Sequence, residues 1–145
     1  GMRNMEVEGA NGGLHTNYEG KVMAAIQALK EGSDFVYIHV EAPDEMGHQG
    51  NMENKITAIE YLDQNGIARM QEELQKMGED YRMLVMPDHP TPLAIRTHSS
   101  NPVPYLLFDS RKEASGQPEY SEAAGKASGI YVQNGYELMN HLLEI

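Results

Sequence analysis

The chain has 145 residues, of which 40% are hydrophobic and 23% charged, a composition typical of one ordered domain and not of a disordered segment. It contains no cysteine, which excludes disulfides, zinc fingers and iron–sulfur clusters, so any metal must be held by oxygen and imidazole ligands. With 22 acidic and 11 basic residues the formal net charge is −11, so neither nucleic acid nor a membrane surface is expected as a partner.

The N-terminal residues 1–17 predict a loop. Gly1 ahead of Met2 is typical of a purification-tag scar, and the run Gly9-Ala10-Asn11-Gly12-Gly13 shows no hydrophobic periodicity. No basic-then-apolar signal pattern is present, and no apolar run reaches the roughly 18 residues of a membrane span. We therefore expect one compact, cytoplasmic unit.

The first predicted helix covers residues 18–30, with Thr16 or Asn17 as its cap. Its apolar side chains recur at helical spacing, at Val22, Ala25, Ile26 and Leu29. A long helical pattern runs from about Ile56 to Gly78, and Asn65-Gly66 predicts a kink or irregularity within it. A terminal helix is expected from about Gly135 onward, packed on the sheet.

Three strands are predicted, at residues 34–40, 81–86 and 103–109. The first two are joined by the long helix in a βαβ pattern, which favours a parallel sheet. Residues 110–129 are rich in Ser, Gly, Lys and Glu and predict a surface segment of variable structure.

Ligand-type side chains follow the first two of these predicted strands. Asp44 and His48 come after the first strand, and on one turn of helix they would face the same way, so they could share a metal ion. Asp88 and His89 follow the second strand; as neighbours in an extended chain they would point to opposite sides and reach adjoining positions. His98 lies in the proline-rich loop beyond them.

Any one of these motifs alone is more typical of a hydrogen-bonded surface pair, whereas three together at strand ends favour a metal site. Imidazole and carboxylate suit zinc or manganese, and two adjoining ions would serve phosphoryl transfer. The remaining histidines are expected to be structural or solvated, at His15, His39 and His141.

Three ordered motifs resemble those of the cofactor-independent phosphoglycerate mutases, members of the alkaline phosphatase superfamily. The motifs are Pro43-Asp44-Glu45-Met46-Gly47-His48-Gln49-Gly50, Pro87-Asp88-His89 and Thr97-His98-Ser99-Ser100-Asn101-Pro102-Val103-Pro104. Further runs resemble the archaeal-type branch of this family, at Tyr18-Glu19-Gly20-Lys21 and Pro87-Asp88-His89-Pro90-Thr91-Pro92. The resemblance implies an α/β three-layer sandwich with a mostly parallel sheet flanked by helices, of which residues 18–145 would be the C-terminal part.

The resemblance also implies a ligand set for two divalent ions, manganese in the mutases and zinc or magnesium in related phosphatases. Asp44, His48 and His98 would hold one ion, and Asp88 and His89 would hold the other. The family converts 3-phosphoglycerate to 2-phosphoglycerate, a glycolytic step, through a phosphoserine intermediate. None of the serines here lies in a setting like that of the family's nucleophile, so we assign none and expect this chain alone to be inactive.

Two alternatives stay open at this point. The same metal chemistry could serve another acceptor, such as homoserine, or the chain could be a non-catalytic domain that binds metal or phosphate. A small phosphorylated substrate is expected for either enzyme. A half-sheet would also leave an edge or an apolar face exposed, which favours self-association.

Overall fold

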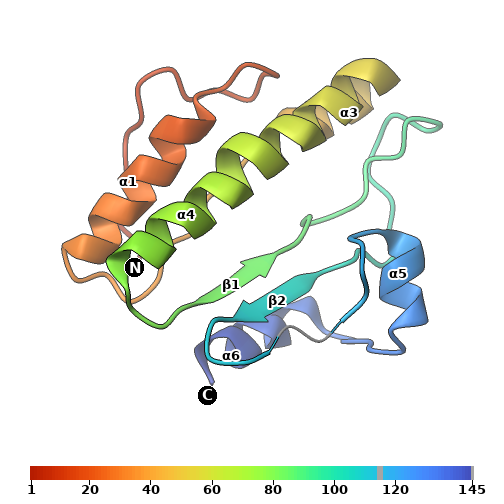
Figure 1. Ribbon diagram of the computed structural model, residues 1–145. Coiled ribbons are helices and arrows are strands. Elements are labelled where there is room, and N and C mark those ends of the chain that lie inside the picture. The colour runs from red at the N-terminus through yellow and green to blue at the C-terminus, as the bar shows by residue number, and fades with distance from the viewer. Residues whose placement is uncertain (114–115, 145) are drawn as a thin grey trace. The chain divides into compact units, whose positions relative to one another are not determined.

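Helices and two short strands make up the computed structural model, which describes residues 1–113 and 116–144 (Figure 1). These residues form two compact units, where the chain length predicts one. The first unit comprises residues 1–78 and 91–98, and the second comprises residues 79–90 and those from 99 onward. Within the described residues, no helix is both long enough and apolar enough to cross a membrane.

The first unit begins with a loop and helix α1 (Tyr18–Lys30), whose bounds are those predicted from its periodicity. The Asn17 side chain caps it by accepting a hydrogen bond of 2.8 Å from the backbone N–H of Gly20. Its inner face is buried along the stripe Tyr18, Val22, Ala25, Ile26 and Ala28. Because these side chains recur every three or four residues, one face of α1 forms much of the core of this unit.

Helices α2 (Ala42–Gln49) and α3 (Met52–Tyr61) form a hairpin in the same unit. Gly50 ends α2 in the left-handed region, at φ 67°, a conformation that costs glycine little because it has no Cβ. Asn51 then caps α3 by accepting from the N–H of Asn54 at 3.0 Å. The hairpin closes over a small apolar cluster of Ala42, Met46 and Ala58, with Leu14 and Val40 packed against it.

Helix α3 continues through a π-helical segment (Leu62–Ile67) into α4 (Ala68–Met77), and Figure 1 shows α3 and α4 as successive parts of one rod. The predicted irregularity at Asn65-Gly66 lies inside the π-helical segment, which confirms it. A π-helical turn holds extra residues and so shifts the side chains that follow it around the helix. The buried side chains Met70 and Leu74 of α4 lie beyond this shift, and α4 packs against α1.

The strand predicted over residues 34–40 is not formed in this structure. The run keeps the alternation of a strand, with Tyr37 and His39 exposed and Ile38 and Val40 partly buried. However, a strand needs a hydrogen-bonded neighbour, and within the described residues this run has none. The Lys21 ammonium instead donates to the carbonyl of His39 at 2.6 Å.

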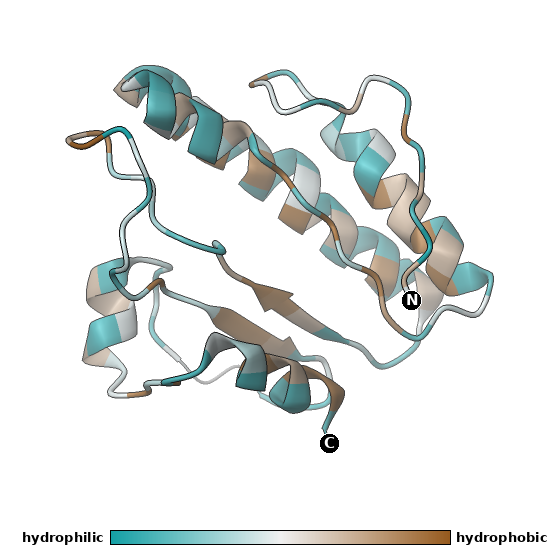
Figure 2. Cartoon of the chain, turned by 180° about the vertical axis from the view of Figure 1, so that it is seen from behind, coloured by the Kyte–Doolittle hydropathy of each residue, from teal (hydrophilic) through white to brown (hydrophobic). Residues whose placement is uncertain are grey.

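The second unit contains the two strands of the described sheet, β1 (Arg82–Val85) and β2 (Leu106–Asp109). They pair antiparallel, with Arg82 opposite Asp109 and Val85 opposite Leu106. The predicted second and third strands are therefore present but shorter, and β1 pairs with β2 and not with residues 34–40. Figure 2 shows both strands largely in the colour of hydrophobic residues, although Leu106 and Leu107 of β2 are exposed.

Short helices complete the second unit. Helix α5 (Glu122–Ala127) lies in the segment predicted to be variable, capped by Ser121, whose hydroxyl accepts from Ala124 N–H at 3.1 Å. A 3₁₀ turn (Gly135–Glu137) leads into α6 (Leu138–Leu143), which confirms the predicted terminal helix. Arg82 of β1 donates to the carbonyl of Leu142 at 2.8 Å, so this helix is tied to the sheet.

Candidate metal centre

Helix α2 supplies two of the predicted ligands. Asp44 lies in its first turn and His48 in its last, so their spacing of four residues places both on one face. The Nε2 atom of His48 lies 3.4 Å from Oδ2 of Asp44. The sequence-based prediction that these two side chains face the same way is confirmed.

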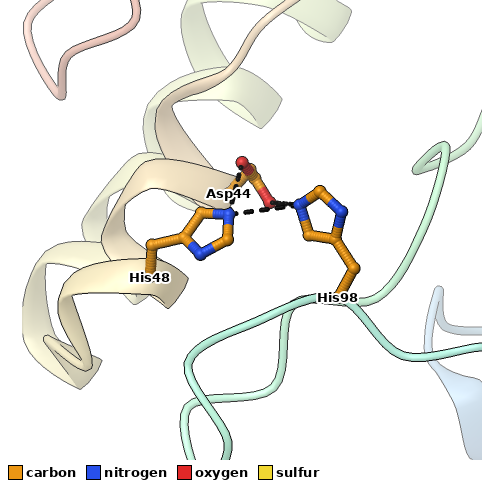
Figure 3. Close-up of side chains that lie close together, drawn as sticks. All are labelled: Asp44, His48 and His98. Carbon is orange, nitrogen blue, oxygen red and sulfur yellow. Dashed lines mark hydrogen bonds and ion pairs between the residues drawn. The ribbon is translucent and has the colours of Figure 1, made fainter.

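The third predicted ligand, His98, comes from a loop of the same unit. The loop turns where the N–H groups of Ile95 and Arg96 both point to the carbonyl of Pro92, and Arg96 adopts φ 52°. This turn brings His98 Nε2 within 3.4 Å of Asp44 Oδ1 and 3.1 Å of His48 Nε2. Figure 3 shows the three side chains pointing toward one another, two from the helix and one from the loop.

One ligand atom from each of these residues lies within 4.8 Å of the other two. One carboxylate oxygen and two imidazole nitrogens form a donor set that suits zinc or manganese and leaves coordination positions open for water or substrate. The side chains are partly open to solvent, with Asp44 at 30%, His48 at 37% and His98 at 50% exposure. The residues present therefore fit a divalent cation at a site that small molecules can reach.

The backbone of Arg96 sets the tautomer of His48. Its carbonyl oxygen lies 3.0 Å from Nδ1 of His48, and a carbonyl can only accept, so Nδ1 carries the proton. Nε2 is then the ring nitrogen that would bind a metal. This use of a second ring nitrogen to orient a ligand is common in metal sites.

Sequence reasoning missed two residues that contact the ligands or their supports. Thr91 is buried at 5% exposure, and its hydroxyl donates a short hydrogen bond to Oδ1 of Asp44. Lys55 of α3 donates to the carbonyl of Thr91 at 2.6 Å. The signal that could have found Thr91 was its place directly after the Pro87-Asp88-His89-Pro90 motif; no local pattern marked Lys55.

Asp88 and His89 lie in the second unit, beyond β1. They do not point to opposite sides as predicted: Nε2 of His89 lies 3.4 Å from Oδ2 of Asp88, and His89 N–H donates to Asp88 Oδ1 at 3.1 Å. The prediction assumed extended backbone, whereas the chain bends at both residues. Within this unit the two residues form a local pair.

The three histidines left out of the predicted site have other surroundings. The ring of His15 lies 6.1 Å from that of Tyr61, and Nδ1 of His39 is 3.1 Å from the hydroxyl of Tyr37. His141 lies in the last turn of α6. None of them belongs to the cluster of metal-type ligands found among the described residues.

A family model described as the metalloenzyme superfamily matches residues 1–144. The chain belongs to the metalloenzyme superfamily. It is 46% identical to a probable 2,3-bisphosphoglycerate-independent phosphoglycerate mutase from Geobacter sulfurreducens and 43% identical to a 2,3-bisphosphoglycerate-independent phosphoglycerate mutase from Methanothrix thermoacetophila. Each similarity covers 99% of this metalloenzyme chain but 36% of the relative.

A solved structure of a protein from Pyrococcus horikoshii superposes on this metalloenzyme with a TM-score of 0.84 and 26% identity, covering 95% of this chain and 41% of that one. The resemblance to cofactor-independent phosphoglycerate mutases is thus confirmed, and the chain spans about a third of the length of the curated relatives above. A metalloenzyme fold of the alkaline-phosphatase type is supported by both comparisons.

Proposed function

We propose that this chain is the metal-binding portion of a 2,3-bisphosphoglycerate-independent phosphoglycerate mutase. The observation that carries the proposal is the convergence of Asp44, His48 and His98 on one point, in a chain 46% identical to a probable mutase of this kind. The reaction is the interconversion of 3-phosphoglycerate and 2-phosphoglycerate through a phosphoserine intermediate. The substrate is accordingly a small phosphorylated acid.

In this proposal Asp44, His48 and His98 hold one divalent cation, manganese before zinc or magnesium, and Asp88 and His89 contribute to a second. A cation held there would act as a Lewis acid on the oxygens of the transferring phosphoryl group. It would also supply positive charge that the chain, with a formal net charge of −11, otherwise lacks. The described residues of the chain contribute orientation: the Arg96 carbonyl accepts from Nδ1 of His48, so Nε2 is the nitrogen that would bind the cation.

The nucleophile is assigned to residues outside this chain. No serine here takes that role in our proposal, and the chain spans 36% of its first relatives, so most of their length is not represented in it. In the complete protein we expect residues 34–40, which already alternate in exposure, to pair as a strand of a mostly parallel sheet.

Calorimetric titration with Mn²⁺ tests the proposal directly. The wild-type chain should bind, and the double variant Asp44→Ala/His48→Ala should lose tight binding. His15→Ala and His141→Ala are matched controls because they remove imidazoles outside the triad. Unchanged affinity in the double variant would contradict the metal assignment.

An activity measurement tests the proposal that the nucleophile lies outside this chain. The 145-residue chain with added Mn²⁺ should not convert 3-phosphoglycerate to 2-phosphoglycerate. Turnover that disappears on replacing one of its own serines would show that the nucleophile lies within the chain, contrary to the proposal.

A further inference from the structure

Thr91 is a buried polar residue that contacts a ligand of the candidate metal centre. It is 5% exposed, and its hydroxyl donates to Oδ1 of Asp44, the oxygen that also lies 3.4 Å from His98 Nε2. The other oxygen of the same carboxylate lies 3.4 Å from His48 Nε2. A donor fixed on Oδ1 therefore sets the rotation of the carboxylate, and with it the direction that each oxygen presents to the two imidazoles.

Lys55 holds Thr91 in place from the neighbouring helix. Its ammonium donates to the Thr91 carbonyl at 2.6 Å, and the two residues are separated by 36 positions in sequence. A charged donor makes this a strong hydrogen bond, particularly since it is partly buried. The start of the loop that carries His98 is thereby tied to α3.

Gly47 is the residue that lets these groups come so close. A Cβ added there would lie 2.7 Å from the Thr91 carbonyl oxygen, 2.9 Å from Lys55 Nζ and 2.9 Å from Thr91 Cγ2. Real Cβ atoms do not approach backbone atoms so closely, so any side chain at position 47 would push Thr91 and Lys55 away from α2. Gly47 lies one residue before the ligand His48, on the helix that also carries Asp44.

The loop is consequently fastened at both ends to the helical hairpin. At one end Lys55 and Asp44 bind Thr91, and at the other the Arg96 carbonyl binds Nδ1 of His48. Each ligand of α2 thus has a partner from this loop. Such partners beyond the direct ligands commonly affect metal affinity by about 10- to 100-fold.

We infer that Thr91, held by Lys55 across Gly47, is a positioning residue that sets the orientation of the Asp44 carboxylate for metal binding. This inference rests on the proposed metal site of Asp44, His48 and His98. Thr91 does not bind the cation itself; it acts through Asp44. Lys55 and Gly47 act through Thr91.

The test is Mn²⁺ affinity, measured by calorimetry on the 145-residue chain, with the unfolding temperature of the metal-free protein as a second readout. Thr91→Val keeps the shape of the side chain and removes the hydroxyl, so affinity should fall by about 10- to 100-fold. Thr91→Ser keeps the hydroxyl and should restore affinity close to wild type. A residue that merely packs would show no such rescue by serine.

Thr57→Val is the matched control. The Thr57 hydroxyl donates to the carbonyl of Glu53 at 3.0 Å within α3, so this variant also removes a bonded threonine hydroxyl from the first unit. Its Mn²⁺ affinity should equal that of the wild type. A fall as large as that of Thr91→Val would overturn the inference.

Lys55→Met and Gly47→Ala test the route through Thr91. Each should weaken Mn²⁺ binding, and adding Lys55→Met to Thr91→Val should cause little further loss, because residues that act as one unit are not additive. If the losses of Mn²⁺ affinity in the two single variants add fully in the double variant, Lys55 does not act through Thr91. Where Thr91→Val fails to fold, these two variants carry the test, and unchanged affinity in both would overturn the inference.

The two proposals fail in different ways. A wild-type chain that does not bind Mn²⁺ overturns the metal site and the inference with it. A wild-type chain that binds, together with a folded Thr91→Val variant of equal affinity, overturns the positioning role alone.

Discussion

The two units of this chain use their polar side chains differently. In the first unit Asp44, His48 and His98 converge on a point that faces solvent. In the second unit Arg82 and Arg111 both bind Asp109, and that carboxylate is only 9% exposed. A carboxylate and two imidazoles gathered at a surface suit a cation, whereas oppositely charged side chains that hydrogen-bond one another join parts of their own unit.

The units also differ in how much apolar surface they bury. The first unit has a stripe of fully buried side chains on α1, including Val22 and Ile26. In the second unit the buried hydrophobic residues among those described are Ala124 and Leu138. We therefore expect the first unit to depend on hydrophobic packing and the second to depend more on its ion pairs.

Removing core volume from the first unit should give the largest effect on stability. Ile26 is 1% exposed, so Ile26→Ala should lower the free energy of unfolding by about 2–5 kcal/mol, as for other buried isoleucines. The exposed Ile130 of the second unit is the control, and Ile130→Ala should change the free energy of unfolding by less than about 0.5 kcal/mol. Urea unfolding followed by circular dichroism measures both; equal losses would contradict the comparison of the two cores.

Removing a ligand from each unit should separate the two candidate metal sites. His98→Ala takes away one of three converging ligands and should weaken Mn²⁺ binding by more than about 100-fold, beyond the usual effect of an outer partner. His89→Ala should have a smaller effect, since the ligand set predicted for the second ion has two members in this chain, Asp88 and His89, and not three. Calorimetry compares them, and a larger loss for His89→Ala would reverse the assignment.

Acidification should destabilise the second unit through Asp109. The Arg111 guanidinium holds the pKa of Asp109 far below its usual value, with help from Arg82. The unfolded state therefore takes up a proton near pH about 4, before the folded state does, and the stability gained from this carboxylate is lost as the pH falls below that value.

Asp109→Asn should accordingly lower stability at neutral pH and reduce its fall on acidification. Asp80→Asn, at an exposed position before β1, is the control and should leave the loss of stability on acidification unchanged. Thermal unfolding between neutral pH and pH about 3 measures the difference. If Asp109→Asn and the wild type lose the same stability on acidification, the ion pairs of Asp109 with Arg82 and Arg111 do not have this role.

The smallest expected effect concerns the turn between α2 and α3. Gly50 has φ 67°, and a Cβ there would also meet the guanidinium of Arg96. Gly50→Ala should cost about 1–2 kcal/mol of stability through the left-handed backbone, with the Arg96 side chain able to move aside. Gly135→Ala, where a Cβ would meet nothing within 4 Å, is the control; a loss as large at Gly135 would mean that the left-handed turn is not the cause.

Much of the helical structure could be predicted from the sequence. Helix α1, the irregularity at Asn65-Gly66 and the terminal helix all lie where the periodicity indicated. The pairing of the strands could not be predicted from the sequence. The run 34–40 has the composition and alternation of a strand but no partner among the described residues, and β1 pairs antiparallel with β2.

The candidate site divides in the same way. The sequence by itself determined that Asp44 and His48 share one face, because helical hydrogen bonds join residues four apart and fix their directions locally. The family resemblance implied that His98 joins them, although it lies 50 residues from His48, and the tertiary structure shows the contact. Only the tertiary structure decided that Lys55 reaches across Gly47 to hold Thr91 against Asp44. Those contacts depend on where a loop closes and how closely two helices pack, and no spacing along the chain encodes either.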